Sequence, residues 1–207
     1  MKKVLIFYCA LFNLHGFSQS NWQQFKKLLC PEKTWVIFHV FKAKKAFKIS
    51  EEAQRVTDSV AKTPLLDGDK NGGQVDAFKH AYLMARLHQE VGKNAALKLG
   101  KAHEKSNYLQ YKKRQLEDGE HPDKISSEMD LFNNAVGVTY TKKGVPYPKN
   151  GLIYRIVNEI LAGKLKVVKK DSALNYVTCN GKLIPKNTLK GKWESNKCLV
   201  ESNYMIY

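Results

Sequence analysis

The stretch from 67 to 104 constrains this chain most, because it places ionisable residues on helix faces that should be buried. An acid-rich turn leads into two amphipathic segments that Gly92 separates. On a helical wheel, Asp76 and His80 begin the apolar stripe of the first segment, which leucine and valine residues continue to position 91. Burying such groups costs free energy unless each finds a partner. The sequence therefore predicts a polar site inside the core.

Hydrophobic periodicity along the rest of the chain predicts a mainly α fold: a single helical-bundle domain of about five or six helices. Capping and turn residues bound the other expected helices, which run from Ser50 to Pro64, from 94 to 105, from Ser127 to Gly137 and from Asn150 to Gly163. Beyond them, short β-like runs and an Asn180-Gly181 turn predict a small β-rich C-terminal extension. We expect the helical domain at 21–165 and the extension at 166–207.

Residues 1–20 have the pattern of a secretory signal peptide. Two lysines precede an apolar run of about a dozen residues, and small polar residues follow. That run is shorter than the roughly 20 residues that a membrane span needs. We therefore expect an exported protein, periplasmic or secreted, with no transmembrane segment after cleavage.

Three cysteines lie beyond the predicted signal peptide, and an oxidising compartment permits a disulfide. We expect Cys179 to pair with Cys198, because both lie in the loop-rich extension. Closing a loop of about twenty residues contributes roughly 3 kcal/mol. Cys30 would then be free or buried. The absence of a C-x-x-C pair argues against a structural zinc site of that type.

The chain is strongly basic, with a formal net charge of +16. This charge favours anionic partners, namely an envelope polymer or lipid, and it is also compatible with nucleic acid. A simple lysine-covered surface is the alternative, since the lysines are spread through every segment. The segment 31–49 mixes aromatic residues with lysines, so it is either an interfacial helix or part of the core covering.

Three expected helices each bring polar groups to an apolar face. These residues are Asp76 and His80, then His103 and Glu104, then Asp130, Asn133 and Asn134. A short helical bundle can gather such groups around a metal ion or a water molecule. Histidine with carboxylates is a common ligand set for zinc, manganese or iron in hydrolytic sites. A satisfied hydrogen-bond network is the alternative, and Asp130 also fits a capping box with Ser127.

Other motifs are incomplete. His103-Glu104 lacks the second histidine of a zincin motif, because position 107 is Asn. A calcium-like loop begins with oxygen ligands at alternate positions but has Phe78 in place of its final glutamate; its candidate ligands are Asp67, Asp69 and Asn71. A turn that caps the next helix is the alternative there. No serine or cysteine lies in a nucleophile elbow.

The motif strings N-G-G-Q-V-D-A-F-K-H-A-Y, A-H-E and M-D-L-F-N-N-A-V-G occur in this order. Together they resemble a family of exported bacterial proteins, the DUF6973 type, which is also similar to domains at the ends of some polymorphic toxins. The resemblance covers roughly 64–165, with Lys79 where Arg is usual and Leu83 where Trp is usual. The matching residues are Asn71, Gly72, Asp76, His80, His103, Glu104, Asp130, Asn133, Asn134 and Gly137. The resemblance implies a shared site and no particular reaction.

Two hypotheses follow for function. The first is a hydrolase-like enzyme in which the buried polar cluster activates water, with a divalent metal held by Asp76, His80, His103 and Asp130. Glu104 would be the base, with His103 and Asn134 as further catalytic groups. The second is a non-enzymatic cell-envelope module whose polar cluster is structural and whose basic surface binds anionic polymer or lipid.

Overall fold

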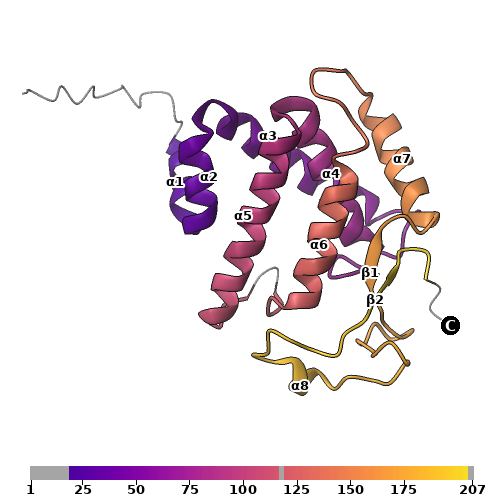
Figure 1. The fold of residues 1–207 in the computed structure, drawn as a ribbon. Coiled ribbons are helices and arrows are strands. Elements are labelled where there is room, and N and C mark those ends of the chain that lie inside the picture. The colour runs from indigo at the N-terminus through magenta and orange to yellow at the C-terminus, as the bar shows by residue number, and fades with distance from the viewer. Residues whose placement is uncertain (1–18, 117–118, 205–207) are drawn as a thin grey trace, which may run out of the picture.

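The computed structural model describes residues 19–116 and 119–204, which form a helical body with a short C-terminal extension (Figure 1). The helices are α1 (Gln19–Lys27), α2 (Cys30–Phe38), α3 (Val40–Val60), α4 (Gln74–Val91), α5 (Lys93–Lys112), α6 (Lys124–Gly137), α7 (Lys149–Leu161) and α8 (Lys186–Leu189). Strands β1 (Lys166–Val168) and β2 (Leu199–Glu201) pair antiparallel. The predicted mainly α fold is confirmed. Most of the predicted signal peptide, residues 1–18, lies outside the described residues.

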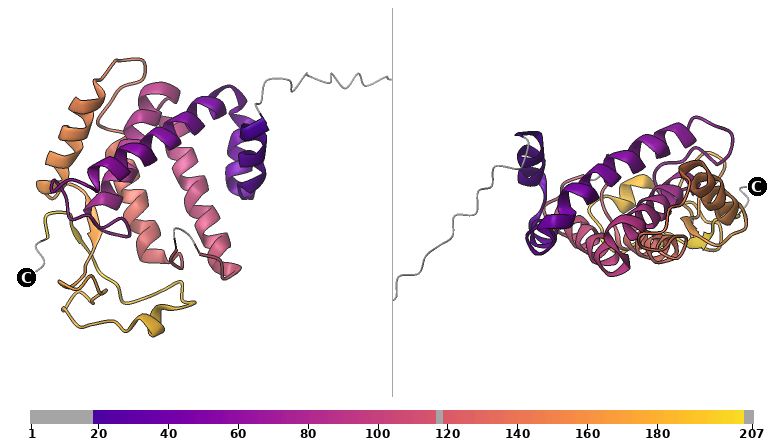
Figure 2. Two further views of the ribbon diagram at one scale, coloured as in Figure 1. Left: turned by 180° about the vertical axis from the view of Figure 1, so that it is seen from behind. Right: turned by 90° about the horizontal axis from the view of Figure 1, so that it is seen from above.

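Helix α4 lies at the centre of the fold, with α3, α5, α6 and α7 packed against it. Its Val75, Phe78, Tyr82 and Leu87 are fully buried. Apolar residues on several faces let one helix support a core on each side. One apolar core joins α4 to α7 and the end of α3, and a second joins it to α2, the start of α3 and α5. Seen from behind, α3 crosses the other helices obliquely (Figure 2).

Helix α6 approaches α4 closely because it ends in a residue without a side chain. A Cβ atom on Gly137 would lie 2.5 Å from the carbonyl oxygen of Ala81 and 2.7 Å from its Cα atom. Any side chain there would push the two helices apart. This contact lies one residue from His80, so it sets the distance between His80 and the polar residues of α6.

Helix α6 also begins earlier than its sequence pattern predicts. Asp123 is the N-cap, and its carboxylate accepts a 3.0 Å hydrogen bond from the backbone N–H of Ser126. The predicted start at Ser127 is therefore wrong by about one turn, and so is the capping-box interpretation of Asp130. Asp130 lies inside the helix, where its carboxylate can serve a site.

The C-terminal extension is fastened to the helical body at several points. Asn133 of α6 donates to the carbonyl of Lys166 and accepts from its N–H, both at 2.9 Å, which fixes β1 against α6. The predicted disulfide between Cys179 and Cys198 is confirmed, and Cys30 is free and exposed. The predicted tight turn at 180–181 is present, where Gly181 has a φ of +80°.

Two buried lysines complete this attachment. Lys170 lies 2.5 Å from the carboxylate of Asp69, and Lys197 lies 2.6 Å from that of Asp123. Both ammonium groups also face the ring of Tyr176, at 4.8 and 3.6 Å from its centroid. Since each charge has an opposite charge beside it, the penalty for burying it is offset. Within the described parts of the chain, no helix is long and apolar enough to cross a membrane.

Replacing Lys197 with Met should lower the free energy of unfolding by about 3–5 kcal/mol, because the carboxylate of Asp123 would stay buried without its counter-charge. Lys124→Met is the matched control. Lys124 pairs with Glu194 at the exposed surface, and losing such a pair costs about 1 kcal/mol or less. Urea denaturation of both variants measures the difference. Equal losses would contradict a structural role for the buried pair.

Candidate metal centre

Three potential metal ligands meet between α4 and α6. Asp76 and His80 lie one turn apart on α4, and Asp130 faces them from α6. The ligand atoms of these three residues, hereafter the Asp/His/Asp cluster, all lie within 4.8 Å of one another. His80 and Asp130 are buried, and Asp76 is partly buried. The structure thus brings together residues that the sequence separates by up to 54 positions.

The ring of His80 is oriented by Asn134. Its Nδ1 lies 3.3 Å from the side-chain oxygen of Asn134, which can only accept a hydrogen bond. Nδ1 therefore carries the proton in the neutral ring, and the lone pair of Nε2 points toward the two carboxylates. Nε2 lies 3.2 Å from Asp130 Oδ1 and 3.6 Å from Asp76 Oδ1. Three electron-rich atoms converge on one point, which is an arrangement that a cation stabilises.

Electrostatics favour the neutral form of this imidazole. Burial lowers the pKa of His80 well below its usual value, and positive charge at Lys79 and His103 acts in the same direction. The hydrogen bond with Asn134 opposes this shift. Neutral imidazole is the form of histidine that binds metal.

The acidic turn before α4 fixes the other aspartate of the cluster. The N–H of Gly72 donates a 2.8 Å hydrogen bond to Asp76 Oδ2, while Oδ1 of the same carboxylate faces His80. Earlier in the turn, Asp67 accepts hydrogen bonds from the N–H groups of Asp69 and Gln74. The turn therefore holds the start of α4, as the capping interpretation of this loop expects.

The predicted calcium loop has a lysine ammonium among its oxygens. Lys170 lies 2.5 Å from Asp69 Oδ2 and donates at 2.6 Å to the carbonyl of Asn71. The positive charge that a calcium ion would bring to the loop of Asp67, Asp69 and Asn71 is thus supplied by the protein itself. Calcium binding at this loop stays a prediction.

A small polar cavity of about 70 Å³ adjoins the Asp/His/Asp cluster. It has room for an ion with a few water molecules. His103 and His121 line it, and so does Tyr176, whose hydroxyl donates a 2.8 Å hydrogen bond to Glu120. Tyr176 belongs to the C-terminal extension, so this extension forms part of the cavity wall. No spacing pattern in the sequence links Tyr176, Glu120 and His121 to α4, so only the structure places them at the cavity.

His103 lines the same cavity but lies outside the Asp/His/Asp cluster. Its Nδ1 is 3.1 Å from Oε1 of Glu32, which comes from α2, 71 positions earlier. Burial alone would raise the pKa of Glu32, but the hydrogen bond and charge of His103, with bonds from Leu29 and Ser106, hold it below its usual value. Glu32 is therefore an ionised partner that orients His103. No motif in the sequence marks it.

The remaining predicted residues are placed differently. Glu104 is buried, accepts a 3.3 Å hydrogen bond from Asn107 and does not line the polar cavity. Asn133 binds the backbone of β1. Of the predicted polar set, the structure thus joins Asp76, His80 and Asp130 and places His103 and Asn134 beside them.

The fold and this cluster define a helical domain with a candidate site for a divalent cation. A family model described as a domain of unknown function (DUF6973) matches residues 33–164, and the chain belongs to this family. The match begins well before the predicted 64–165 and includes most of α2 and all of α3. Searches of curated proteins and of solved structures each found no match to the chain.

Replacing Asp130 with Asn tests the electrostatics of the cluster. The variant removes one of two carboxylates facing the Nε2 lone pair and supplies an amide that can donate to it. In the presence of a chelator, we expect the free energy of unfolding to rise by about 1 kcal/mol. Added zinc or manganese should stabilise only the unsubstituted protein, because a ligand stabilises the state that binds it.

Urea denaturation with and without metal gives both quantities. Glu128→Gln is the control, since it removes an exposed carboxylate from the same helix. Two results together would show that the cluster is a structural network. In chelator, Asp130→Asn would be less stable than the original protein, and added metal would not stabilise the original protein.

Proposed function

We propose that this protein is an exported hydrolase in which the Asp/His/Asp cluster binds a divalent cation: zinc, manganese or iron. The observation that carries the proposal is the convergence of His80 Nε2 with two carboxylate oxygens beside a polar cavity. One imidazole and two carboxylates suit these metals. A bound divalent cation lowers the pKa of a water ligand and so makes hydroxide available near neutral pH.

The chain supplies a base beside that cation. Glu32 holds Nδ1 of His103, which leaves the opposite nitrogen of the ring as the proton acceptor in its neutral form. A carboxylate that orients an imidazole in this way is the arrangement of many hydrolytic sites. Lys79 also lines the cavity, where its charge favours the negative charge that develops during attack by water. We therefore assign proton transfer to His103, oriented by Glu32.

Export is part of this proposal. The Cys179–Cys198 disulfide is compatible with it, since disulfides persist in oxidising compartments and are rare in the cytosol.

Turnover of a panel of chromogenic esters, anilides and phosphodiesters tests the enzyme. We expect hydrolysis that a chelator removes and added metal restores. His103→Ala should lower kcat by about a hundredfold to ten-thousandfold while metal binding is retained, because general base catalysis contributes that much. Glu104→Gln should have little effect, since Glu104 does not line the cavity.

The comparison of these two variants separates the predicted bases. A large loss of kcat in Glu104→Gln with none in His103→Ala would reverse the assignment. Binding of no divalent metal by the purified protein, measured by mass spectrometry after metal loading, would remove the enzymatic proposal.

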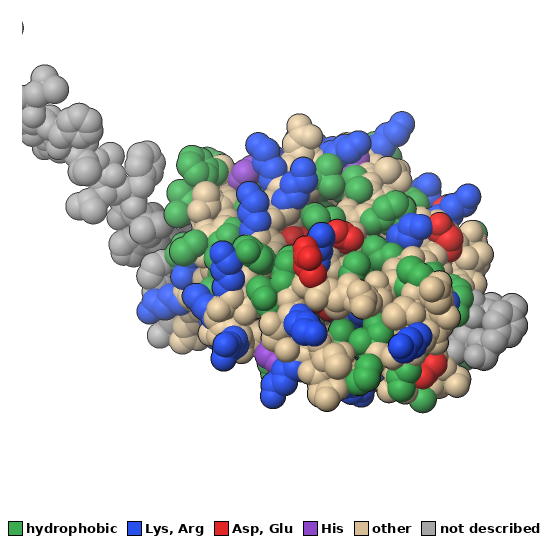
Figure 3. All heavy atoms as spheres, turned by 60° about the horizontal axis from the view of Figure 1, so that its bottom comes forward, with side chains coloured by type: hydrophobic (Ala, Val, Ile, Leu, Met, Phe, Trp, Pro, Cys, Tyr) green, Lys and Arg blue, Asp and Glu red, His purple; other side chains and the backbone are tan. Residues whose placement is uncertain are grey.

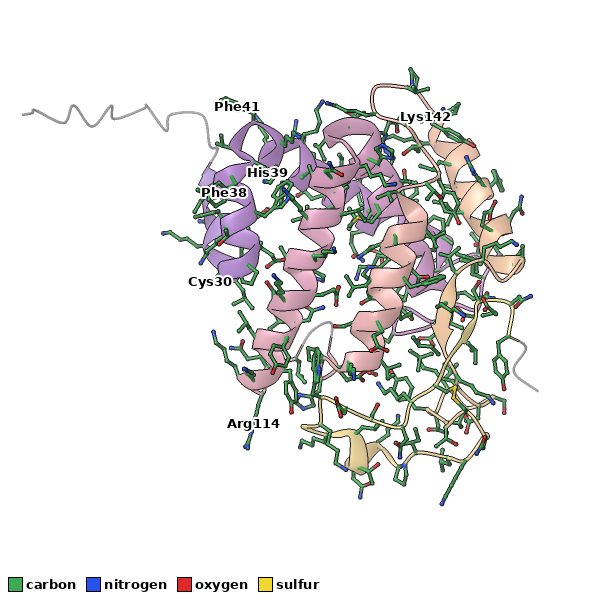
Figure 4. All side chains as sticks on the ribbon, in the orientation of Figure 1. Cys30, Phe38, His39, Phe41, Arg114 and Lys142 are labelled. Carbon is green, nitrogen blue, oxygen red and sulfur yellow. A yellow bond between two sulfur atoms is a disulfide. The ribbon has the colours of Figure 1, made fainter. Side chains whose placement is uncertain are left out.

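One observation favours the second candidate function, a cell-envelope module that binds anionic lipid. Four apolar residues lie exposed where α2 meets α3: Ile37, Phe38, Val40 and Phe41. Figure 4 labels Phe38 and Phe41 at this corner. Phe38 is 79% and Phe41 is 99% exposed. Lysines follow at 42, 44, 45 and 48. Lysines are scattered over the face in Figure 3, and at this exposed apolar corner several of them follow the apolar residues directly in the chain.

Vesicle sedimentation tests this candidate. The protein should bind vesicles that contain phosphatidylglycerol more tightly than vesicles of phosphatidylcholine alone. Phe38→Ser with Phe41→Ser should weaken binding by tenfold or more, because each buried Phe contributes about 1.5–3 kcal/mol. Tyr154→Ser, at an exposed position of α7, is the control. Equal binding of the double variant and the control would rule out insertion of this corner.

A further inference from the structure

A pocket lined by polar side chains lies where α3 faces the acidic turn and the first turns of α4. It has a volume of about 200 Å³. The residues that line it are Gln54, Thr57, Lys70, Asn71 and Lys79. Each of these side chains carries a hydrogen-bond donor, two of them are cationic, and none of the five is a carboxylate. This α3–α4 pocket therefore offers donors and positive charge, which is the chemistry that binds an oxyanion.

One donor of the pocket, the hydroxyl of Thr57, has no hydrogen-bond partner among the described residues. Thr57 is only 1% exposed and lines the pocket. A buried hydroxyl without a partner lowers stability, and native structures retain few of them. An oxygen of a bound ligand would accept this hydrogen bond. The Thr57 hydroxyl thus points to a ligand with acceptor oxygens, independently of the charge of the lysines.

One carboxylate competes for the donors of the pocket without lining it. Asp58 accepts a 2.6 Å hydrogen bond from Lys70 and a 3.2 Å bond from Gln54. The bond from Lys70, followed by that from Gln54 and by the charge of Lys62, holds the pKa of Asp58 below its usual value. An ammonium group carries several donors, so Lys70 retains others for a ligand. Lys79 adds a second cation to the lining.

The other nearby carboxylates are engaged elsewhere. Lys170 binds Asp69, and backbone N–H groups donate to Asp67. Asp76 and Asp130 line the polar cavity and not the α3–α4 pocket. The structure therefore offers separate places to a cation, at the Asp/His/Asp cluster, and to an anion, in the pocket.

The α3–α4 pocket and the polar cavity adjoin, since Lys70, Asn71 and Lys79 line both. We propose that the pocket binds a phosphate group that the substrate carries beside the bond to be cut. A phosphate group presents several acceptor oxygens at once, which suits ammonium, amide and hydroxyl donors together. The idea that this phosphate ester is the substrate rests on the proposed hydrolase; binding of the phosphate group does not.

Calorimetric titration of the metal-free full chain with methyl phosphate and with inorganic phosphate tests the proposal. Both titrations are run at one ionic strength and at a pH where both ligands are dianions. Methyl phosphate should bind saturably and at least as tightly as inorganic phosphate, because its methyl group has room in the adjoining cavity. A preference for inorganic phosphate would assign the pocket to the free ion and overturn its role toward a substrate. Absence of saturable binding would overturn the proposal as a whole.

Two threonine variants locate the phosphate group. Thr57→Val removes a hydroxyl without a partner, so the melting temperature should hold or rise. Methyl phosphate should bind about tenfold more weakly, since a hydrogen bond to a charged group contributes that much. Thr141→Val is the matched control: Thr141 is also buried, but its hydroxyl donates at 2.6 Å to the carbonyl of Ala85, outside the pocket. The control should melt earlier and keep its affinity. Unchanged affinity in Thr57→Val would contradict binding in this pocket.

Lys70→Gln, with Lys62→Gln as its control, tests the charge of the pocket. Both lysines are exposed and both act on Asp58, but only Lys70 lines the pocket. The two substitutions change the net charge equally. Methyl phosphate should bind about tenfold more weakly to the Lys70 variant and with nearly unchanged affinity to the control. Equal losses in both variants would show a general attraction to the basic surface and overturn the pocket.

Asp130→Asn separates this inference from the proposed function. The variant should lose metal binding and turnover, and it should bind methyl phosphate at least as tightly, because one carboxylate of the adjoining cavity is gone. Phosphate binding by a protein that binds no metal would remove only the hydrolase. Metal-dependent turnover of uncharged esters without phosphate binding would remove only the phosphate site.

Discussion

Enclosure of α4 by its neighbours is the constraint on which the rest of the structure depends. Four other helices pack against α4, so its side chains lie against protein. Asp76 and His80 are among these side chains. Charged groups that lose water need partners. Gly72 and Asn134 supply hydrogen bonds, and α6 supplies a second carboxylate. A neutral imidazole and two carboxylate oxygens converge there, which is why we interpret the cluster as a candidate cation site.

The C-terminal extension belongs to the same argument. Its buried lysines neutralise Asp69 and Asp123, residues that hold the turn before α4 and the start of α6. Both of these elements position ligands of the cluster. The extension therefore stabilises the helix ends that present the site, and Tyr176 between the two lysines closes one side of the polar cavity.

The sequence predicts most of what depends on local spacing. The i, i+4 pair on α4, the polar residues of α6 and the disulfide all follow from periodicity and composition, and the structure has each of them. What it does not predict depends on packing between distant segments. Glu32 meets His103 across 71 positions, and Lys170 enters the acidic turn across 101 positions. The start of α6 is missed for another reason, since a polar stretch offers several caps and only Asp123 is used.

The family match ends at 164, two residues before β1 begins, whereas Tyr176 lies beyond it. The cluster and one residue of the cavity wall beside it, Tyr176, thus lie in separate parts of the chain. A protein that kept 33–164 and carried a different tail would keep the three ligands but would need other counter-charges for Asp69 and Asp123. The tail is thus both part of the entrance to the cluster and part of what holds its ligands in place.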